Sequence, residues 1–172
     1  MEIREAPGKA GFKRMRISIL TVSDSVAAGK YEDASGPALV ARCRELGWRI
    51  VSTAVLGDDR ATIEEFLKKT ADSNDADVVL TTGGTGLGPR DVTPEATIAV
   101  VDRLIPGFAE HMRIEGLKKT PRALLSRGAA GIRGKALIIN LPGSPRGAVE
   151  SLDAIAELLP HAVEVLHGAH HE

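Results

Sequence analysis

The stretch of this chain best suited to chemistry is residues 78–97, VVLTTGGTGLGPRDVTPEAT. It begins with a β-branched apolar run, typical of a buried strand, and continues through several closely spaced glycines. Asp91 follows them, and then Thr93 and Pro94 favour the N-cap and the first position of a helix. A strand, a glycine-rich loop and a helix N-terminus can together present backbone N–H groups to an anion. The alternative is a plain connector, and the loop alone does not decide between the two.

Two carboxylates are predicted to lie near this loop. Asp91 is part of the stretch, and Asp58 lies in a Gly-Asp-Asp turn after another predicted strand. Mg²⁺ is commonly bound by one or two carboxylates together with phosphate oxygens and several waters. Capping of the next helix is the competing explanation for Asp58 and for its neighbour Asp59. Glu95 is a weaker candidate, because an acid in the first turn of a helix is already stabilised by the helix dipole.

A second turn, PGSP at residues 142–145, offers another place for an anion. It follows a strongly apolar predicted strand and precedes a long predicted helix, so Gly143 and Ser144 would lie at a helix N-terminus. An ordinary turn is the alternative. Lys30 and Arg90 are the bases considered for phosphate contact, although most surface bases are only solvated. The glycine pattern matches neither the dinucleotide-binding fingerprint nor the P-loop.

The elements that must position these residues alternate between strand and helix. This alternation predicts a three-layer α/β/α domain with a mostly parallel central sheet. Ligands of such sheets bind beyond the carboxyl ends of the strands, so the four loops that follow the strands should meet at one rim. Residues 123–133 are ambiguous. We expect strands over residues 17–22, 48–56, 78–80 and 136–141, and helices over 36–46 capped by Ser35, 60–70, 94–101, 108–117 and 146–166 with a kink at Pro160.

Length and composition limit the possible functions. A chain of 172 residues favours one domain, which we place at residues 15–168, after a loosely ordered leader (1–14) and before a frayed tail (169–172). The net charge of −1 gives no overall attraction to nucleic acids or anionic membranes. Aromatic residues make up only 3%, which argues against the stacking platforms of single-stranded nucleic-acid binding proteins.

Cysteine usage and hydropathy bear on location. Cys43 is the only cysteine, so no intrachain disulfide forms, and its neighbours indicate a plain thiol packed in a helix. The sequence contains no apolar run of 18 residues and no secretory signal at its N-terminus. These features predict a cytoplasmic protein without a membrane span.

Several motifs occur together in the order seen in a known family. GGTG followed by RDVTPEAT and later by LPGSP, with an SDS loop and a GDD turn before them, resembles the molybdopterin-binding MogA/MoaB family. The likeness covers about residues 17–166. It implies molybdopterin adenylyltransferase activity, in which the terminal phosphate of molybdopterin attacks the α-phosphate of Mg-ATP and pyrophosphate leaves. The family's fold is similar to the one expected from the alternation of strands and helices.

The resemblance also assigns roles to residues. It implies that Asp58 and Asp91 are catalytic and hold Mg²⁺ directly or through water. It further implies a homotrimer, and a separate molybdenum insertase that receives the product. Two alternatives remain: a non-catalytic molybdopterin carrier or scaffold, and a general nucleotide or phosphosugar enzyme on a doubly wound sheet. The implied substrate-binding residues are Ser23, Asp24, Gly83, Gly84, Thr85, Gly86, Pro142, Gly143, Ser144 and Pro145.

Overall fold

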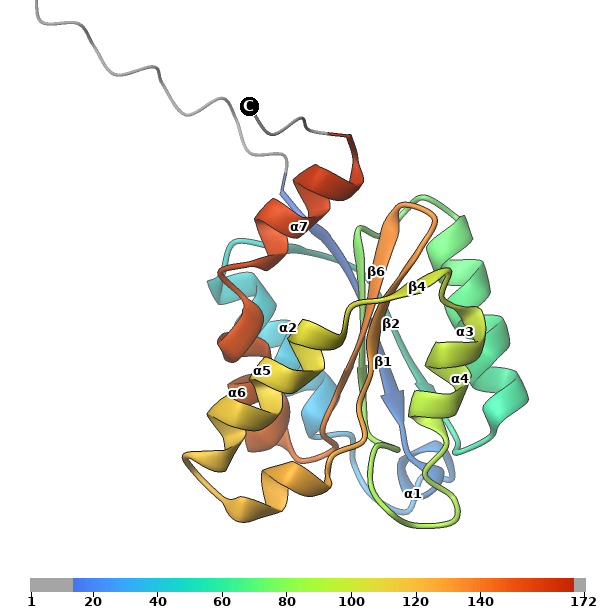
Figure 1. Ribbon diagram of the computed structural model, residues 1–172. Coiled ribbons are helices and arrows are strands. Elements are labelled where there is room, and N and C mark those ends of the chain that lie inside the picture. The colour runs from blue at the N-terminus through green and yellow to red at the C-terminus, as the bar shows by residue number, and fades with distance from the viewer. Residues whose placement is uncertain (1–13, 169–172) are drawn as a thin grey trace, which may run out of the picture.

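A six-stranded sheet forms the centre of the protein in a computed structural model that describes residues 14–168 (Figure 1). The strand order is β2-β1-β3-β6-β5-β4, in which β2, β1, β3 and β6 are parallel. β5 runs antiparallel to β6, and β4 runs antiparallel to β5. The strands are β1 (Arg16–Val22), β2 (Arg49–Leu56), β3 (Val78–Thr82), β4 (Arg103–Leu104), β5 (Ala130–Arg133) and β6 (Ala136–Leu141).

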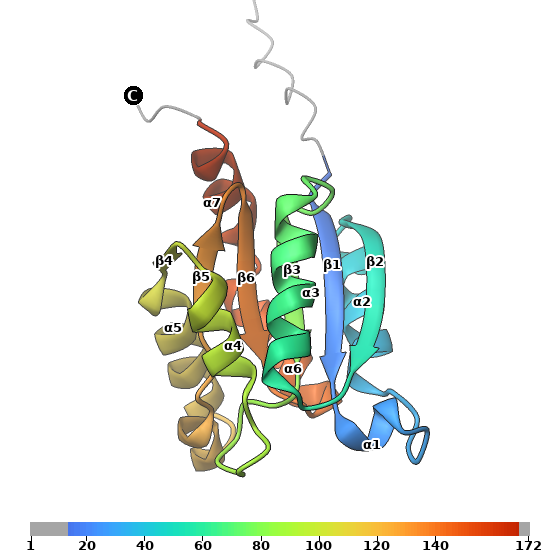
Figure 2. The same ribbon diagram turned by 90° about the vertical axis from the view of Figure 1, so that its right-hand side faces the viewer.

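Helices cover both faces of the sheet, which confirms the predicted three-layer architecture (Figures 1 and 2). One face packs against α2 (Ser35–Glu45), α5 (Pro106–Leu117), α6 (Pro145–Ile155) and α7 (Leu159–Leu166). The other packs against α3 (Arg60–Asp72) and α4 (Thr93–Val100). Every residue of β3 and β6 is buried, as expected for central strands covered on both sides.

The carboxyl ends of the parallel strands meet at one rim, where the short helix α1 (Asp24–Ala27) also lies (Figure 2). The four loops after β1, β2, β3 and β6 therefore come together, as the parallel sheet requires. Their contact is close: the Thr82 hydroxyl donates a hydrogen bond of 2.6 Å to the Pro142 carbonyl. A methyl group on Gly143 would lie 3.2 Å from the Gly83 Cα.

Three details differ from the sequence-based expectations. The C-terminal helix is two helices, because the Pro160 ring would clash with the carbonyl of Ala156, the C-cap that follows α6. Ser35 does not cap α2; the Asp33 carboxylate instead accepts from the Gly36 N–H at 3.0 Å. Thr93 is the first residue of α4 rather than its N-cap, which is Val92.

The ambiguous segment also acquires structure. It contains the end of the 3₁₀ helix η1 (Pro121–Leu125) and the whole of strand β5. The two-residue strand β4 was not expected. Cys43 is buried in the apolar core, and burial raises the pKa of its thiol to about 12. Apart from Arg14, the predicted leader and tail lie outside the described residues, and the domain limits stay a prediction. Among residues 14–168 no helix is long and apolar enough to cross a membrane.

Asp77 fastens β1 to the start of β3 at the end of the sheet opposite the rim. Its carboxylate accepts hydrogen bonds from the Arg16 backbone at 2.8 Å and from the Arg16 guanidinium at 3.0 Å. Burial alone would raise the pKa of the Asp77 carboxyl, but the hydrogen bonds and charge of Arg16, with a smaller effect of His167, lower it. The ion pair therefore stabilises the fold fully above the unfolded pKa of about 3.9 and less as the pH falls through the folded pKa.

We predict that Asp77→Asn lowers the free energy of unfolding at pH 7 by about 1.5–3 kcal/mol, because Arg16 loses a charged partner. Urea unfolding of the wild type and the variant should show this difference narrowing as the pH falls below about 4. A difference that stays constant across the acid range would contradict this role of the carboxylate.

Candidate active site

A cavity of about 340 Å³ opens at the rim and draws its lining from all four loops. The two predicted catalytic acids, Asp58 and Asp91, both line it. Asp24 does not belong to the lining, and neither do Thr85 and Gly86. Of the predicted substrate-binding residues, the cavity is lined by Ser23, Gly83, Gly84 and Gly143.

Asp58 is held by a reciprocal exchange with Asp24. The Asp24 N–H donates to Asp58 Oδ2 at 2.9 Å, and the Asp58 N–H donates to Asp24 Oδ1 at 2.9 Å. The Arg90 guanidinium donates two hydrogen bonds to the Asp24 carboxylate, from Nε at 2.9 Å and from Nη2 at 3.0 Å. Asp24 therefore braces a site residue, and Arg90 is engaged with Asp24. Capping of α3 falls to Asp59, whose carboxylate accepts from the Thr62 N–H at 2.9 Å.

The electrostatics distinguish these acids. The hydrogen bonds from Arg90 lower the pKa of the exposed Asp24 carboxyl. Burial raises the pKa of the Asp58 carboxyl, and the negative charges of Asp24 and Asp91 raise it further, against the opposing effects of the Asp24 N–H and Arg90. Two carboxylates that face one cavity and repel each other form an environment that a cation would relieve.

The glycine loop wraps around Asp91. The Gly88 N–H donates to Asp91 Oδ2 at 2.9 Å, and a Cβ on either Gly86 or Gly88 would lie only 2.9 Å from that oxygen. At this part of the loop the absence of side chains leaves room for an acid. One N–H group of the loop that was predicted to bind an anion, that of Gly88, therefore binds the Asp91 carboxylate instead.

Arg127 fastens this loop and was not found by sequence analysis. Its Nε donates to the Gly86 carbonyl at 2.7 Å, its Nη2 to the Asp91 carbonyl at 2.8 Å, and its Nη1 pairs with the Glu95 carboxylate. The Arg127 N–H also donates to the Thr85 carbonyl at 2.9 Å. The hydrogen bond from Arg127 lowers the pKa of the Glu95 carboxyl, so Glu95 takes part in the fastening rather than lining the cavity.

A second cavity, of about 460 Å³, lies on the α5 and α6 side of the PGSP turn. Pro142 and Ser144 line it, whereas Gly143 between them lines the first cavity. Pro145 begins α6, and the Ser144 hydroxyl accepts from the Gly147 N–H at 3.0 Å as the N-cap. The turn is thus a wall shared by the two cavities.

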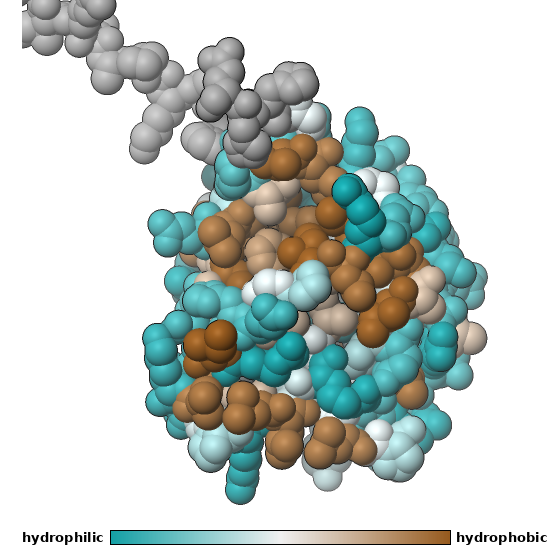
Figure 3. Space-filling view, in the orientation of Figure 1, coloured by the Kyte–Doolittle hydropathy of each residue, from teal (hydrophilic) through white to brown (hydrophobic). Residues whose placement is uncertain are grey.

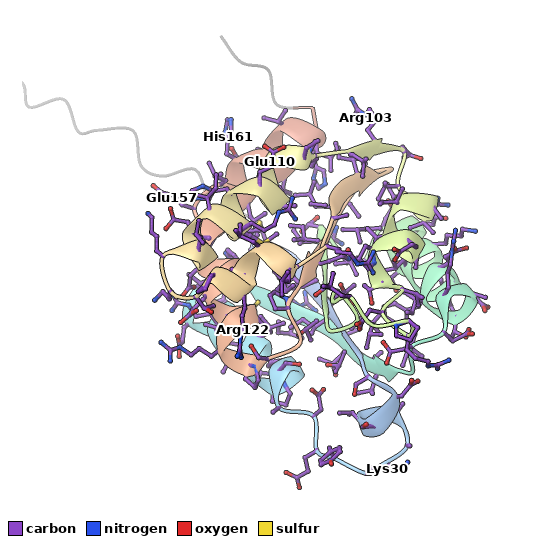
Figure 4. The ribbon with its side chains drawn as sticks, turned by 60° about the horizontal axis from the view of Figure 1, so that its bottom comes forward. Lys30, Arg103, Glu110, Arg122, Glu157 and His161 are labelled. Carbon is purple, nitrogen blue, oxygen red and sulfur yellow. The ribbon has the colours of Figure 1, made fainter. Side chains whose placement is uncertain are left out.

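Both bases and acids line the second cavity, and sequence analysis did not identify them. The indication in the sequence was the concentration of basic residues between positions 113 and 122. These residues come together in space only because η1 packs against α5. Figure 4 shows Arg122 on η1, and places Lys30 at the tip of the segment after α1, away from Arg122. The uncharged polar residues of the lining include Ser126 and Asn140, and its charged residues are three bases and three acids: Arg113, Lys119, Arg122, Glu115, Glu150 and Asp153.

The oxygen atoms at this site suit a magnesium ion that also takes ligands from a phosphate. Asp58 and Asp91 supply carboxylate oxygens to the cavity. The buried Thr93 hydroxyl beside Gly84 lies outside the lining and has no hydrogen-bond partner within residues 14–168. Oxygen ligands are those that Mg²⁺ prefers. No group of three or more His, Cys, Asp and Glu side chains in the described part of the chain is placed to hold a metal, so substrate and water would supply the remaining ligands.

Comparison with known proteins gives consistent matches. The family model described as "Probable molybdopterin binding domain" matches residues 18–161. A molybdopterin adenylyltransferase of Helicobacter pylori strain J99 is 44% identical over 156 residues, which cover 90% of this chain and 89% of the relative.

Solved structures agree with this match. The molybdopterin biosynthesis enzyme MoaB of Thermus thermophilus superimposes with a TM-score of 0.85 at 46% identity, over 90% of this chain and 98% of that structure. The tungsten cofactor synthesizing protein MoaB of Pyrococcus furiosus gives a TM-score of 0.81 at 31% identity, over 90% and 98%.

We predict that Gly86→Ala weakens the binding of Mg-ATP by about tenfold or more while the protein stays folded, because the new methyl group displaces the Asp91 carboxylate. Titration calorimetry measures the binding and thermal unfolding measures the fold. Gly107→Ala in α5 is the matched control, since its methyl group meets no atom within 4 Å. Equal Mg-ATP affinities for the two variants would contradict the role assigned to Gly86.

Proposed function

We propose that this chain, which belongs to the family of the probable molybdopterin binding domain, is a molybdopterin adenylyltransferase of molybdenum cofactor biosynthesis. The observation that carries this proposal is the pair of cavities on either side of the PGSP turn. One is lined only by acids among its charged residues, and Asp58 and Asp91 among them suit Mg²⁺. The other contains three bases, beside three acids, and the bases suit a second phosphorylated molecule. A reaction that joins two polyanions requires a separate binding site for each of them.

Mg-ATP is assigned to the first cavity and molybdopterin to the second. Asp58 and Asp91 would hold Mg²⁺ directly or through water, and the cation neutralises charge on the phosphates of ATP when bound. Arg113, Lys119 and Arg122 offer positive charge to the terminal phosphate of molybdopterin, which would compete with Glu150 for Lys119. The reacting phosphorus and oxygen atoms would then meet beside the PGSP turn, where the two cavities adjoin.

The chemistry makes modest demands on the protein. The attacking phosphate oxygen is already anionic, so no strong general base is needed. Catalysis then rests on alignment of the two substrates and on stabilisation of the charge that develops on the α-phosphoryl oxygens. The fastening of Asp58 by Asp24 and of the Asp91 loop by Arg127 supports this assignment, because each acid is held in place before substrate arrives.

We also propose that the protein is a homotrimer that works in the cytoplasm and passes its product to a separate molybdenum insertase. Figure 3 shows apolar side chains gathered on the face that carries β4 and the neighbouring helices. Ile98 of α4 and Leu104 of β4 are about half exposed, and β4 is an edge strand of the sheet. An exposed apolar surface at a sheet edge supports association with another chain.

The catalytic assignment predicts that Asp91→Asn keeps the melting temperature of the wild type and lowers AMP transfer by at least about a hundredfold. Release of pyrophosphate from Mg-ATP and molybdopterin measures the activity. Asp59→Asn is the matched control: Asn caps a helix about as well as Asp, so this variant should keep both the stability and the activity. Molybdopterin binding without any pyrophosphate release by the wild type would favour the carrier or scaffold instead.

The trimer predicts a mass in solution of three times the 18.2 kDa of one chain, measured by light scattering after size-exclusion chromatography. Leu104→Glu should shift this mass toward that of one chain, because a charge would be buried at the interface. Leu158→Glu, at an equally exposed leucine between α6 and α7, is the control. A wild-type protein that elutes with the mass of one chain would refute the trimer.

A further inference from the structure

The hydroxyl of Thr93 is a buried polar group without a partner. Thr93 begins α4 and has no exposed surface, and its Oγ1 makes no hydrogen bond within the described residues 14–168. Leaving a buried hydroxyl unpaired is unfavourable, so native proteins rarely do it without a reason. As the first residue of α4 rather than its cap, Thr93 does not use the hydroxyl for the helix.

Thr97, one helical turn later, is a threonine whose hydroxyl has a purely structural role, and it provides a comparison for Thr93. It is also completely buried, and its hydroxyl accepts a hydrogen bond of 2.8 Å from the Asn140 side chain. The same amide donates to the Thr81 hydroxyl at 3.0 Å. The contrast within one helix indicates that packing alone does not explain the unpaired hydroxyl of Thr93.

The Thr93 hydroxyl lies beside an unused oxygen of Asp58. A Cβ built on Gly84 would lie 2.2 Å from Thr93 Oγ1 and 3.1 Å from Asp58 Oδ1, so both atoms face the same point. Asp58 Oδ2 accepts from the Asp24 N–H, whereas Oδ1 has no hydrogen bond to any residue from 14 to 168. A buried donor without a partner and a cavity-facing carboxylate oxygen without a protein partner are thus separated only by the position where Gly84 has no side chain.

We propose that Thr93 is a positioning residue for Asp58, and that its hydroxyl donates a hydrogen bond to Asp58 Oδ1 when Mg²⁺ and a nucleotide occupy the first cavity. With Oδ2 held by the Asp24 N–H, both carboxylate oxygens are then fixed. Each oxygen has two lone pairs, so Oδ1 can accept this bond and still face a cation. The inference rests on the proposed function only in taking Mg-ATP as the occupant of this cavity.

The energetic consequence is that the hydrogen bond contributes to ligand binding rather than to folding. In the free protein the hydroxyl is unpaired, so replacing it with a methyl group of the same shape costs no stability. In the bound protein the replacement removes a hydrogen bond to a charged group. A threonine that serves only the fold would show the reverse: a loss of stability and an unchanged affinity for the ligand.

The test compares Thr93→Val, Thr93→Ser and Thr97→Val in the full-length chain. Thr93→Val should melt at or above the wild-type temperature without ligand, bind Mg-ATP about tenfold more weakly and lose AMP transfer by a similar factor. Thr93→Ser keeps the hydroxyl and should stay close to the wild type in Mg-ATP affinity. Thr97→Val should melt below the wild type, because it leaves the Asn140 amide without this partner.

Two outcomes would overturn the inference. One is a Thr93→Val protein that binds Mg-ATP as tightly as the wild type, whatever its melting temperature. The other is a wild type that does not bind Mg-ATP. A wild type that binds Mg-ATP but transfers no AMP to molybdopterin refutes the proposed function alone, since the Mg-ATP affinities of the variants still decide the role of Thr93.

Discussion

Close approach of backbone and carboxylates at the rim is the constraint on which the rest of the site depends. Gly83, with a φ of 100°, lies so near β1 that a Cβ would be 2.2 Å from the Val22 carbonyl oxygen. Gly84 faces Asp58 and Thr93 in the same way, and the next two glycines face Asp91. The loop follows this path only because it has glycine at each of these close approaches. Acids from different strands can therefore share one cavity.

The sequence predicts those parts of the structure that depend on local pattern. Apolar runs locate the parallel strands, and the rule that their carboxyl ends meet brings Asp58 and Asp91 together. Arg127 is different, because nothing near it in the sequence indicates that it binds carbonyl groups 36 and 41 positions earlier. The second cavity depends likewise on how η1 packs against α5.

The incorrect local predictions have a common physical basis. Threonine is a residue type that favours the N-cap, but in the structure Val92 is the N-cap. Helix α4 therefore begins one residue earlier than predicted, at Thr93. The periodic pattern of residues 146–166 is continuous, yet Pro160 cannot be accommodated in the middle of a helix, so α6 and α7 separate. In both places the backbone, rather than the side-chain pattern, determines where the helix begins or ends.

The late position of Arg127 in the chain affects how the protein is made. Strand β3 and the glycine loop are synthesised well before Arg127 and before β6, which pairs with β3 in the finished sheet. During synthesis on the ribosome, the Asp91 loop therefore lacks its hydrogen bonds to Arg127 until the segment that contains Arg127 and β6, up to residue 141, has emerged. Contacts between such distant residues slow the folding of a domain. Nascent chains that end before β6 should accordingly carry both acids without an assembled site.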